Sequence, residues 1–311
     1  MKKQKLLILL LMICLTGCTA VVQPHESALP ETLPAVSTES TAATTEPQET
    51  TQEETEPPQV ILQPEPGDGD FVKVAAYIPD IIVDLRYATE ENFSNQQIYS
   101  FPDAWLRYGT VKKLMQVQEE LRQQGYSLKI WDAFRPASAQ FKLWAVCPNP
   151  AYVANPNKGF SSHSRGNTVD ITLVNADGTE LVMPTGFDDF SKLADRDYSD
   201  CSQTAAENAL LLEQLMIHYG FKPYSGEWWH FSDTQAYPVE EAFEPVAPAA
   251  YYADCNESIS LRTAPDVAAQ TITQIPKDAQ FAVAAKSGRF AWVEYQGVFG
   301  YVLLDYIRQI N

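Results

Sequence analysis

The sequence predicts an α+β fold, an antiparallel sheet with flanking helices, followed by a small all-β module. Residues 71–244 mix helical and strand periodicities without strict alternation, which favours α+β over a doubly wound fold. Residues 250–311 contain short strand-like runs and turn residues. The 311-residue length suffices for two domains plus non-globular sequence, and 45% hydrophobic residues can supply a core.

The first eighteen residues are typical of an export signal. Three lysines precede an apolar run, Leu6 to Leu15, that is shorter than the roughly 20 residues needed to span a bilayer. The ending Leu-Thr-Gly-Cys resembles a bacterial lipobox, which implies cleavage before Cys18 and a lipid on that residue. An ordinary secretory signal with an incidental cysteine is the alternative. In both cases we expect the protein to lie outside the cytoplasm. If the lipobox is genuine, we also expect the lipid on Cys18 to anchor the protein to the cell membrane.

Residues 19–70 are predicted to be a disordered acidic tether. They are rich in Thr, Glu and Pro and contain eleven Asp or Glu but no Lys or Arg. Such a segment cannot bury enough apolar surface to offset its chain entropy. The whole chain has a net charge of -18. Because no basic patch is available for phosphates, nucleic acid is excluded as a partner.

Within residues 71–244, two helices and two strands are predicted most clearly. Residues 110–124 place apolar side chains on one helical face and end at Gly125, and residues 127–132 then alternate as a strand. A second helix is predicted to begin with a capping box of Thr204 and Glu207 and to end at Gly220. Residues 168–174 alternate as another strand.

Three cysteines remain after processing, and the sequence does not fix their state. Cys147 and Cys201 could form a disulfide, which would leave Cys255 unpaired, or all three could be free thiols. None of them has the spacing of a thiolate zinc site.

Two short segments carry candidate metal ligands. His163 lies in a polar loop before the strand 168–174, where Asp170 occupies the face opposite Val169 and Ile171. His230 ends the segment Gly-Glu-Trp-Trp-His, which also contains Glu227. A catalytic zinc uses three nitrogen or oxygen ligands and one open position, and a nearby carboxylate can act as general base. From spacing alone, packed histidines and a chance Glu-x-x-His remain the alternative.

The motifs Ser-x-His-x-x-Gly-x-x-x-Asp and Glu-x-Trp-His, in this order, resemble the zinc D-alanyl-D-alanine dipeptidases of vancomycin resistance and their carboxypeptidase relatives. That family shares its fold with the Hedgehog signalling domain. The resemblance implies one zinc ion held by His163, Asp170 and His230, with Glu227 as catalytic base.

Further stretches resemble the dipeptidase branch, among them residues 83–89, 92–93 and 98–99. The segment Asp-Ala-Phe-Arg-Pro implies that Arg135 stabilises the oxyanion; a structural salt bridge is the alternative. Residues 183–190 resemble the family's Met-Gly-Thr-x-Phe-Asp-x-Phe, with Pro184 where Gly is usual. This resemblance implies that Asp188 binds the free ammonium group of the substrate, with Ser161 nearby.

The run Leu-Arg-Thr-Ala-Pro at 261–265, with Trp292 to Tyr295, Gly297 and Gly300 to Val302, resembles bacterial SH3 domains. The resemblance implies an SH3-like barrel over residues 250–311 that binds the cell wall, although a spacing module is an equal alternative.

Taken together, the sequence predicts zinc-dependent hydrolysis of D-alanyl-D-alanine to two D-alanines outside the cytoplasm, in cell-wall metabolism. Two alternatives remain: a zinc D,D-carboxypeptidase that trims peptidoglycan stem peptides, and a non-catalytic wall-binding lipoprotein. The intact Glu227 and all three ligands argue against the non-catalytic alternative.

Overall fold

A five-stranded sheet forms the centre of the first half of the fold, in the order β2-β4-β5-β7-β6. The structure is a computed structural model that describes residues 61–310. The predicted signal peptide 1–18, with Cys18, and most of the predicted tether therefore lie outside the described residues. The strands are β2 (Ile82–Val83), β4 (Tyr126–Asp132), β5 (Thr168–Asn175), β6 (Phe221–Tyr224) and β7 (Glu227–Asp233).

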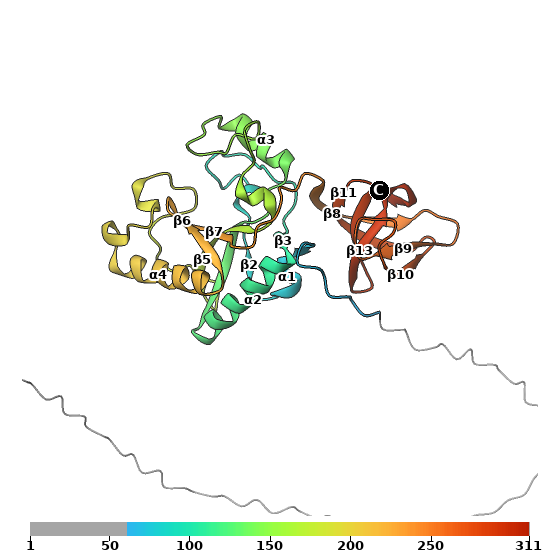
Figure 1. The fold of residues 1–311 in the computed structure, drawn as a ribbon, viewed down its shortest axis with the longest axis horizontal. Coiled ribbons are helices and arrows are strands. Elements are labelled where there is room, and N and C mark those ends of the chain that lie inside the picture. Colours follow the sequence, from blue (N-terminus) through green and yellow to red (C-terminus); the bar gives the residue numbers. More distant parts are fainter. Residues whose placement is uncertain (1–60, 311) are drawn as a thin grey trace, which may run out of the picture. The chain divides into compact units, whose positions relative to one another are not determined.

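The mixed α/β fold agrees with the prediction, but the sheet is not purely antiparallel. β2 pairs with β4 in parallel, whereas β4 with β5, β5 with β7 and β7 with β6 are antiparallel. The parallel pair arises because the chain between β2 and β4 passes through the helix α2 (Tyr108–Gln123), and parallel neighbours need such a crossover. α2 contacts β4, and α4 (Gln203–His218) contacts β5, β6 and β7. Figure 1 shows both helices on one side of this sheet and α3 (Ala137–Val146) on the other.

Both predicted helices form, with one correction at a helix start. In α2 the predicted apolar face is buried, and Gly125 follows the helix with a left-handed φ of 81°. The capping box of Thr204 and Glu207 is wrong, because Ser202 is the N-cap residue of α4. Its hydroxyl accepts a hydrogen bond from the Ala205 amide at 3.2 Å, and the Glu207 carboxylate instead accepts from the Gln203 side chain at 2.8 Å.

A short two-stranded sheet and a one-turn helix precede α2. β1 (Phe71–Lys73) pairs with β3 (Trp105–Arg107), and α1 (Val74–Tyr77) follows β1 directly. Within the described part of the chain, no helix is both long and apolar enough to cross a membrane.

The carboxyl-terminal region is all-β, as expected. It forms a seven-stranded sheet in the order β10-β9-β13-β12-β11-β8-β14. The strands are β8 (Phe243–Ala253), β9 (Ser258–Arg262), β10 (Thr271–Pro276), β11 (Gln280–Ser287), β12 (Phe290–Tyr295), β13 (Val298–Leu303) and β14 (Ile307–Gln309). The outer strands β10 and β14 are not paired with each other, so these described strands do not close into a barrel.

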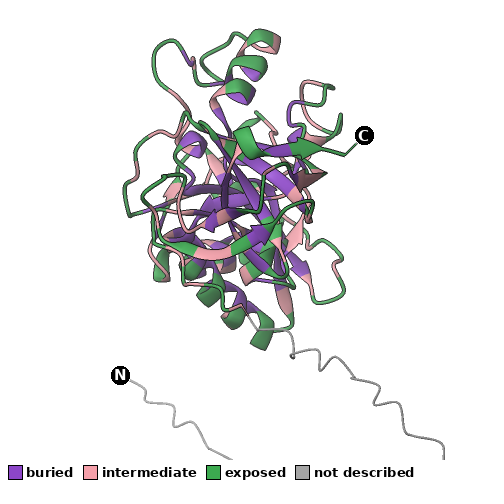
Figure 2. Ribbon diagram, turned by 90° about the vertical axis from the view of Figure 1, so that its right-hand side faces the viewer, coloured by how far each residue is buried: buried purple, intermediate pink, exposed green. Residues whose placement is uncertain are grey.

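Buried residues concentrate along the strands, and the outer helix faces are exposed (Figure 2). The larger core cluster joins the two regions, because it contains Trp105 of β3, Phe243 of β8 and Trp292 of β12. The ring centroids of Trp105 and Trp292 lie 4.9 Å apart in an edge-on contact. Cys147, Cys201 and Cys255 are free thiols in this structure, so the possible Cys147–Cys201 disulfide is not formed.

Candidate active site

The structure brings His163, Asp170 and His230 together from three separate elements. His163 lies in a 3₁₀ turn, Ser162–Arg165, whereas Asp170 and His230 face each other as paired residues of β5 and β7. His163 Nε2 lies 3.3 Å from Asp170 Oδ2 and 3.4 Å from His230 Nδ1, and His230 Nδ1 lies 3.0 Å from Asp170 Oδ1. One ligand atom from each residue lies within 4.8 Å of the other two, as a common metal ion would require.

Two details of this cluster fit a divalent metal ion. His163 Nδ1 lies 2.8 Å from the Ala133 carbonyl, which orients Nε2 toward the cluster. Asp170 Oδ1 is buried and makes no hydrogen bond of acceptable geometry, although His230 Nδ1 is near. A buried carboxylate oxygen left without a hydrogen bond is costly unless another ligand satisfies it. The residues present therefore fit a zinc site with three protein ligands.

Asp170 lies on the face of β5 opposite Val169 and Ile171, and its exposed fraction is only 3%. The loop carrying His163 covers this face of β5, so the carboxylate is buried within a polar site. Burial alone would raise the pKa of Asp170, but His163 and His230 outweigh that effect and lower it. Burial alone would lower the pKa of His163, but the negative charges of Asp170 and Asp132 outweigh that effect and raise the pKa.

Glu227 lies beside this cluster as the first residue of β7. Its Oε2 is 3.4 Å from His230 Nδ1, and the side chain is half-buried. Burial, and then the negative charge of Asp170, raises the pKa of Glu227. A carboxylate with a raised pKa near a metal site has the properties of a general base.

Arg135 lines a cavity together with the His163, Asp170 and His230 cluster and is almost fully buried. Its guanidinium donates to Asp132 Oδ2 at 2.6 Å, to Gln140 Oε1 at 3.2 Å and to the Tyr99 hydroxyl at 3.3 Å. The salt bridge considered as the alternative role is therefore present. A guanidinium has five N–H donors, so these three bonds leave two for a substrate oxygen.

Asp188 is held by Tyr87, whose hydroxyl donates to Asp188 Oδ2 at 2.6 Å. Burial raises the pKa of Asp188 to about 7, although the hydrogen bond from Tyr87 acts in the opposite direction. Ser161 lines the same cavity, and its hydroxyl oxygen accepts from the His163 amide at 3.3 Å. The hydroxyl hydrogen of Ser161 can therefore still donate.

The seven residues predicted for the active site all line one cavity of about 330 Å³. Its outer walls come from the loop 150–154 with Phe160 and from Tyr224 of β6. The sequence did not single out Tyr87, Asp132 or Tyr224 for a role in the site. Tyr87 and Asp132 lie within stretches that resemble the family, but only the fold identifies their partners.

Two histidines, an aspartate and a neighbouring half-buried glutamate, set in a mixed α/β fold, are the groups that metal-dependent hydrolases use. The family described as D-ala-D-ala dipeptidase, peptidase family M15, matches residues 68–248, more than half of the chain. The chain belongs to this family.

Individual relatives agree with the family match. The chain is 36% identical over 172 residues to the D-alanyl-D-alanine dipeptidase of Escherichia coli strain K12, covering 55% of this chain and 89% of that protein. It is 33% identical to the enzyme of the same name from Enterococcus faecium, over 48% of this chain and 83% of that protein. The Streptomyces coelicolor enzyme of that name is 31% identical, with 53% and 91% covered.

Proposed function

We propose that this protein is a zinc-dependent dipeptidase that hydrolyses D-alanyl-D-alanine to two D-alanines. The observation that carries the proposal is the single cavity in which the His163, Asp170 and His230 cluster lies with Glu227, Arg135 and Asp188. A bound zinc ion would polarise the scissile carbonyl and lower the pKa of a water molecule toward about 7.

The protein's own groups then divide the remaining chemistry. Glu227 takes a proton from the attacking water as the water oxygen bonds to the carbonyl carbon. The two free N–H groups of Arg135 stabilise the negative charge that develops on the carbonyl oxygen. When the C–N bond breaks, Glu227 returns the proton to the leaving amine, so the water has been added across the bond.

Asp188 favours a free dipeptide over a stem peptide as the substrate. A partly buried carboxylate at the cavity wall can pair with an ammonium group, and a free dipeptide carries that group only one residue from the scissile bond. A D,D-carboxypeptidase would instead have to accommodate an uncharged amide nitrogen at this position, with the peptide chain continuing beyond it. The names of the relatives point the same way.

The proposed location is outside the cytoplasm, with the lipid on Cys18 as the membrane anchor. The carboxyl-terminal β region is proposed to be an SH3-like module that binds the cell wall. These two proposals rest on the amino-terminal residues and on the motifs of residues 261–302. The dipeptide would then come from the wall, for nutrition or recycling.

The test measures D-alanine release from D-Ala-D-Ala by the zinc-loaded protein, beside Glu227→Gln. We expect release by the parent and a loss of several orders of magnitude in the variant, with zinc binding retained. An amino-blocked D-Ala-D-Ala serves as the second substrate. Preference for the blocked form would favour the carboxypeptidase, and a parent that cannot take up zinc would favour the non-catalytic wall-binding lipoprotein.

A further inference from the structure

The hairpin that carries Glu227 and His230 is irregular at the site. β6 and β7 pair regularly from Phe221 to Pro223, but the next pair joins Tyr224 to Glu227. The three residues of β7 in between, Trp228 to His230, have no partner residue on β6. Pro223 also lacks an N–H, so β6 offers few backbone donors at this point. The backbone carbonyls along this bulge need other hydrogen-bond donors.

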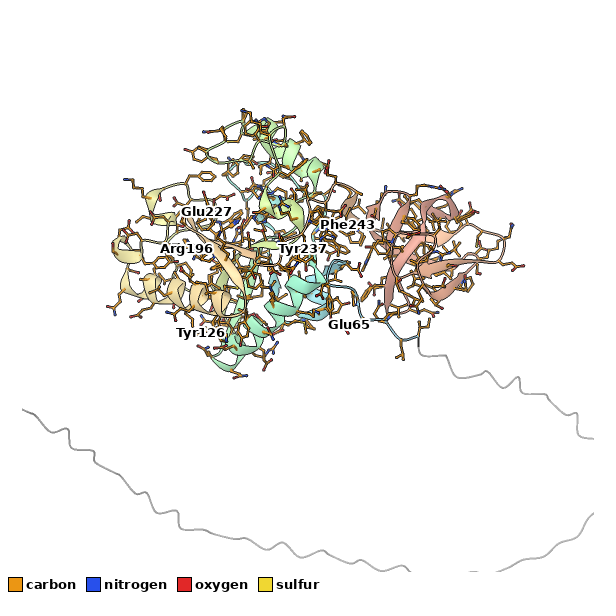
Figure 3. The ribbon with its side chains drawn as sticks, in the orientation of Figure 1. Glu65, Tyr126, Arg196, Glu227, Tyr237 and Phe243 are labelled. Atoms are coloured by element: carbon orange, nitrogen blue, oxygen red, sulfur yellow. The ribbon has the colours of Figure 1, made fainter. Side chains whose placement is uncertain are left out.

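The Arg196 side chain supplies these donors. Its Nη2 donates to the carbonyl oxygens of Glu227 and His230, both at 3.0 Å, and its Nε donates to the Tyr224 carbonyl at 2.8 Å. The backbone amide of Arg196 also donates to the Ser225 carbonyl at 3.3 Å. Figure 3 shows Arg196 next to Glu227. One residue thus spans the bulge from Tyr224 to His230.

Arg196 is itself held from its other side. Its Nη1 donates to Glu213 Oε2 of α4 at 2.8 Å and to the Tyr198 hydroxyl at 3.3 Å, and Tyr198 donates to the same carboxylate oxygen. The guanidinium also lies over the buried Phe231 ring, 4.6 Å from its centroid. These hydrogen bonds use both sides of the planar guanidinium, which a lysine cannot reproduce because its three donors share one nitrogen.

We propose that Arg196 is a positioning residue that fixes the catalytic base and one metal ligand relative to each other. It does not reach the reacting atoms; it acts through the backbone of Glu227 and His230. Glu213 connects this arrangement to α4, so the bulge is held against the helical layer. The inference rests on the proposed function, because it assumes that Glu227 is the base and His230 a ligand.

The experiment compares the parent with Arg196→Met, which keeps the aliphatic stem, and with Arg196→Lys. For each protein, kcat and KM for D-Ala-D-Ala are measured, and zinc affinity is measured separately by chelator competition. We expect Arg196→Met to lower kcat and zinc affinity by about 10- to 100-fold, with a smaller change in KM. Arg196→Lys should recover only part of the loss.

Leu121→Ala is the matched control for lost stability. Leu121 is fully buried at the far end of α2, so its truncation should lower the melting temperature without changing kcat or zinc affinity. The proposal is overturned if Arg196→Met retains parental kcat and zinc affinity, or if Leu121→Ala loses both to the same extent. A parent that binds no zinc and releases no D-alanine would instead overturn the proposed function, which is a distinguishable result.

Discussion

Asp188 combines two unfavourable features at one position. Its backbone has a positive φ of 52° that non-glycine residues seldom adopt, and the partial burial of its carboxylate raises its pKa to about 7. A hydrogen bond from Tyr87 offsets only part of this cost. Such costs persist mainly where a site needs them, which agrees with the proposed role of Asp188 in binding an ammonium group.

The variant Asp188→Asn should therefore stabilise the metal-free protein at high pH while weakening substrate binding. Between pH 4 and 7 the folded chain holds a proton on Asp188 that the unfolded chain has released, so the stability contributed by this group declines as the pH rises through that window. We expect Asp188→Asn to raise the melting temperature more at pH 8 than at pH 5, and to raise KM for D-Ala-D-Ala at least about tenfold. An equal shift at both pH values would contradict the burial argument.

Arg135 provides a second prediction. Arg135→Lys keeps the charge but cannot maintain the three bonds to Asp132, Gln140 and Tyr99 while also donating to the substrate. We expect kcat to fall by about 10²- to 10³-fold with little change in zinc affinity. Arg122→Lys, at an exposed arginine of α2, is the control and should leave kcat unchanged. Parental kcat in Arg135→Lys would rule out oxyanion stabilisation by the guanidinium.

For single residues, the sequence predicted those that stand in ordered motifs, but it did not predict their hydrogen-bond partners. His163, Asp170, His230 and Glu227 could be chosen because the motifs occur together and in order. Tyr87 and Asp188 are 101 residues apart, and Arg196 is 31 residues from Glu227. No local periodicity links residues so far apart, so only the folded chain could assign Tyr87 and Arg196 their roles.

The 3₁₀ turn that presents His163 ends in Gly166, which has a left-handed φ of 74°. A β-carbon added there would lie 2.5 Å from the Phe71 ring, so a side chain meets both a conformational and a steric penalty. We expect Gly166→Ala to lower the melting temperature and to weaken zinc affinity, measured by thermal unfolding and chelator competition. Gly288→Ala is the control, since its left-handed φ is similar and its β-carbon meets nothing within 4 Å. Equal losses of zinc affinity in both variants would contradict this account.

The loops at the cavity rim meet in an aromatic contact. Tyr152 stacks on Phe190 with centroids 4.3 Å apart, and Phe190 contacts Phe93, which contacts Tyr87. The two ends of this chain of rings, Tyr152 and Tyr87, line the cavity together with Asp188. We expect Tyr152→Ala to increase hydrolysis of amino-blocked D-Ala-D-Ala relative to the free dipeptide, measured as the ratio of kcat/KM values. An unchanged ratio would mean that the stack does not limit substrate length.

Among the elements, regular segments were predictable and irregular ones were not. The long amphipathic helix and the strand after it followed from periodicity. The predicted start of α4 was wrong because Ser202 and Thr204 are both residue types that cap helices. In the structure Ser202 is the N-cap residue. The parallel pairing of β2 and the bulge in β7 depend on tertiary neighbours, which a single segment does not specify.

For the molecule as a whole, the larger core cluster predicts cooperative unfolding. Trp292 of β12 packs edge-on against Trp105 of β3, and both belong to the same core. We expect the described part of the chain to unfold in one calorimetric transition. Trp292→Ala should destabilise it by about 3 to 5 kcal/mol and lower the temperature at which activity is lost. Two transitions, with only one shifted by the substitution, would contradict this expectation.

β8 begins at Phe243, which stacks on Phe71 with nearly parallel rings, and the same strand continues into the β region to Ala253. The family match ends at residue 248, inside this strand. The end of the family match therefore does not coincide with a boundary between separately packed regions of the chain. If recombination replaced the carboxyl-terminal region, the new sequence would need aromatic side chains that pack against Phe71 and Trp105. This requirement limits the domains that could be exchanged at this position.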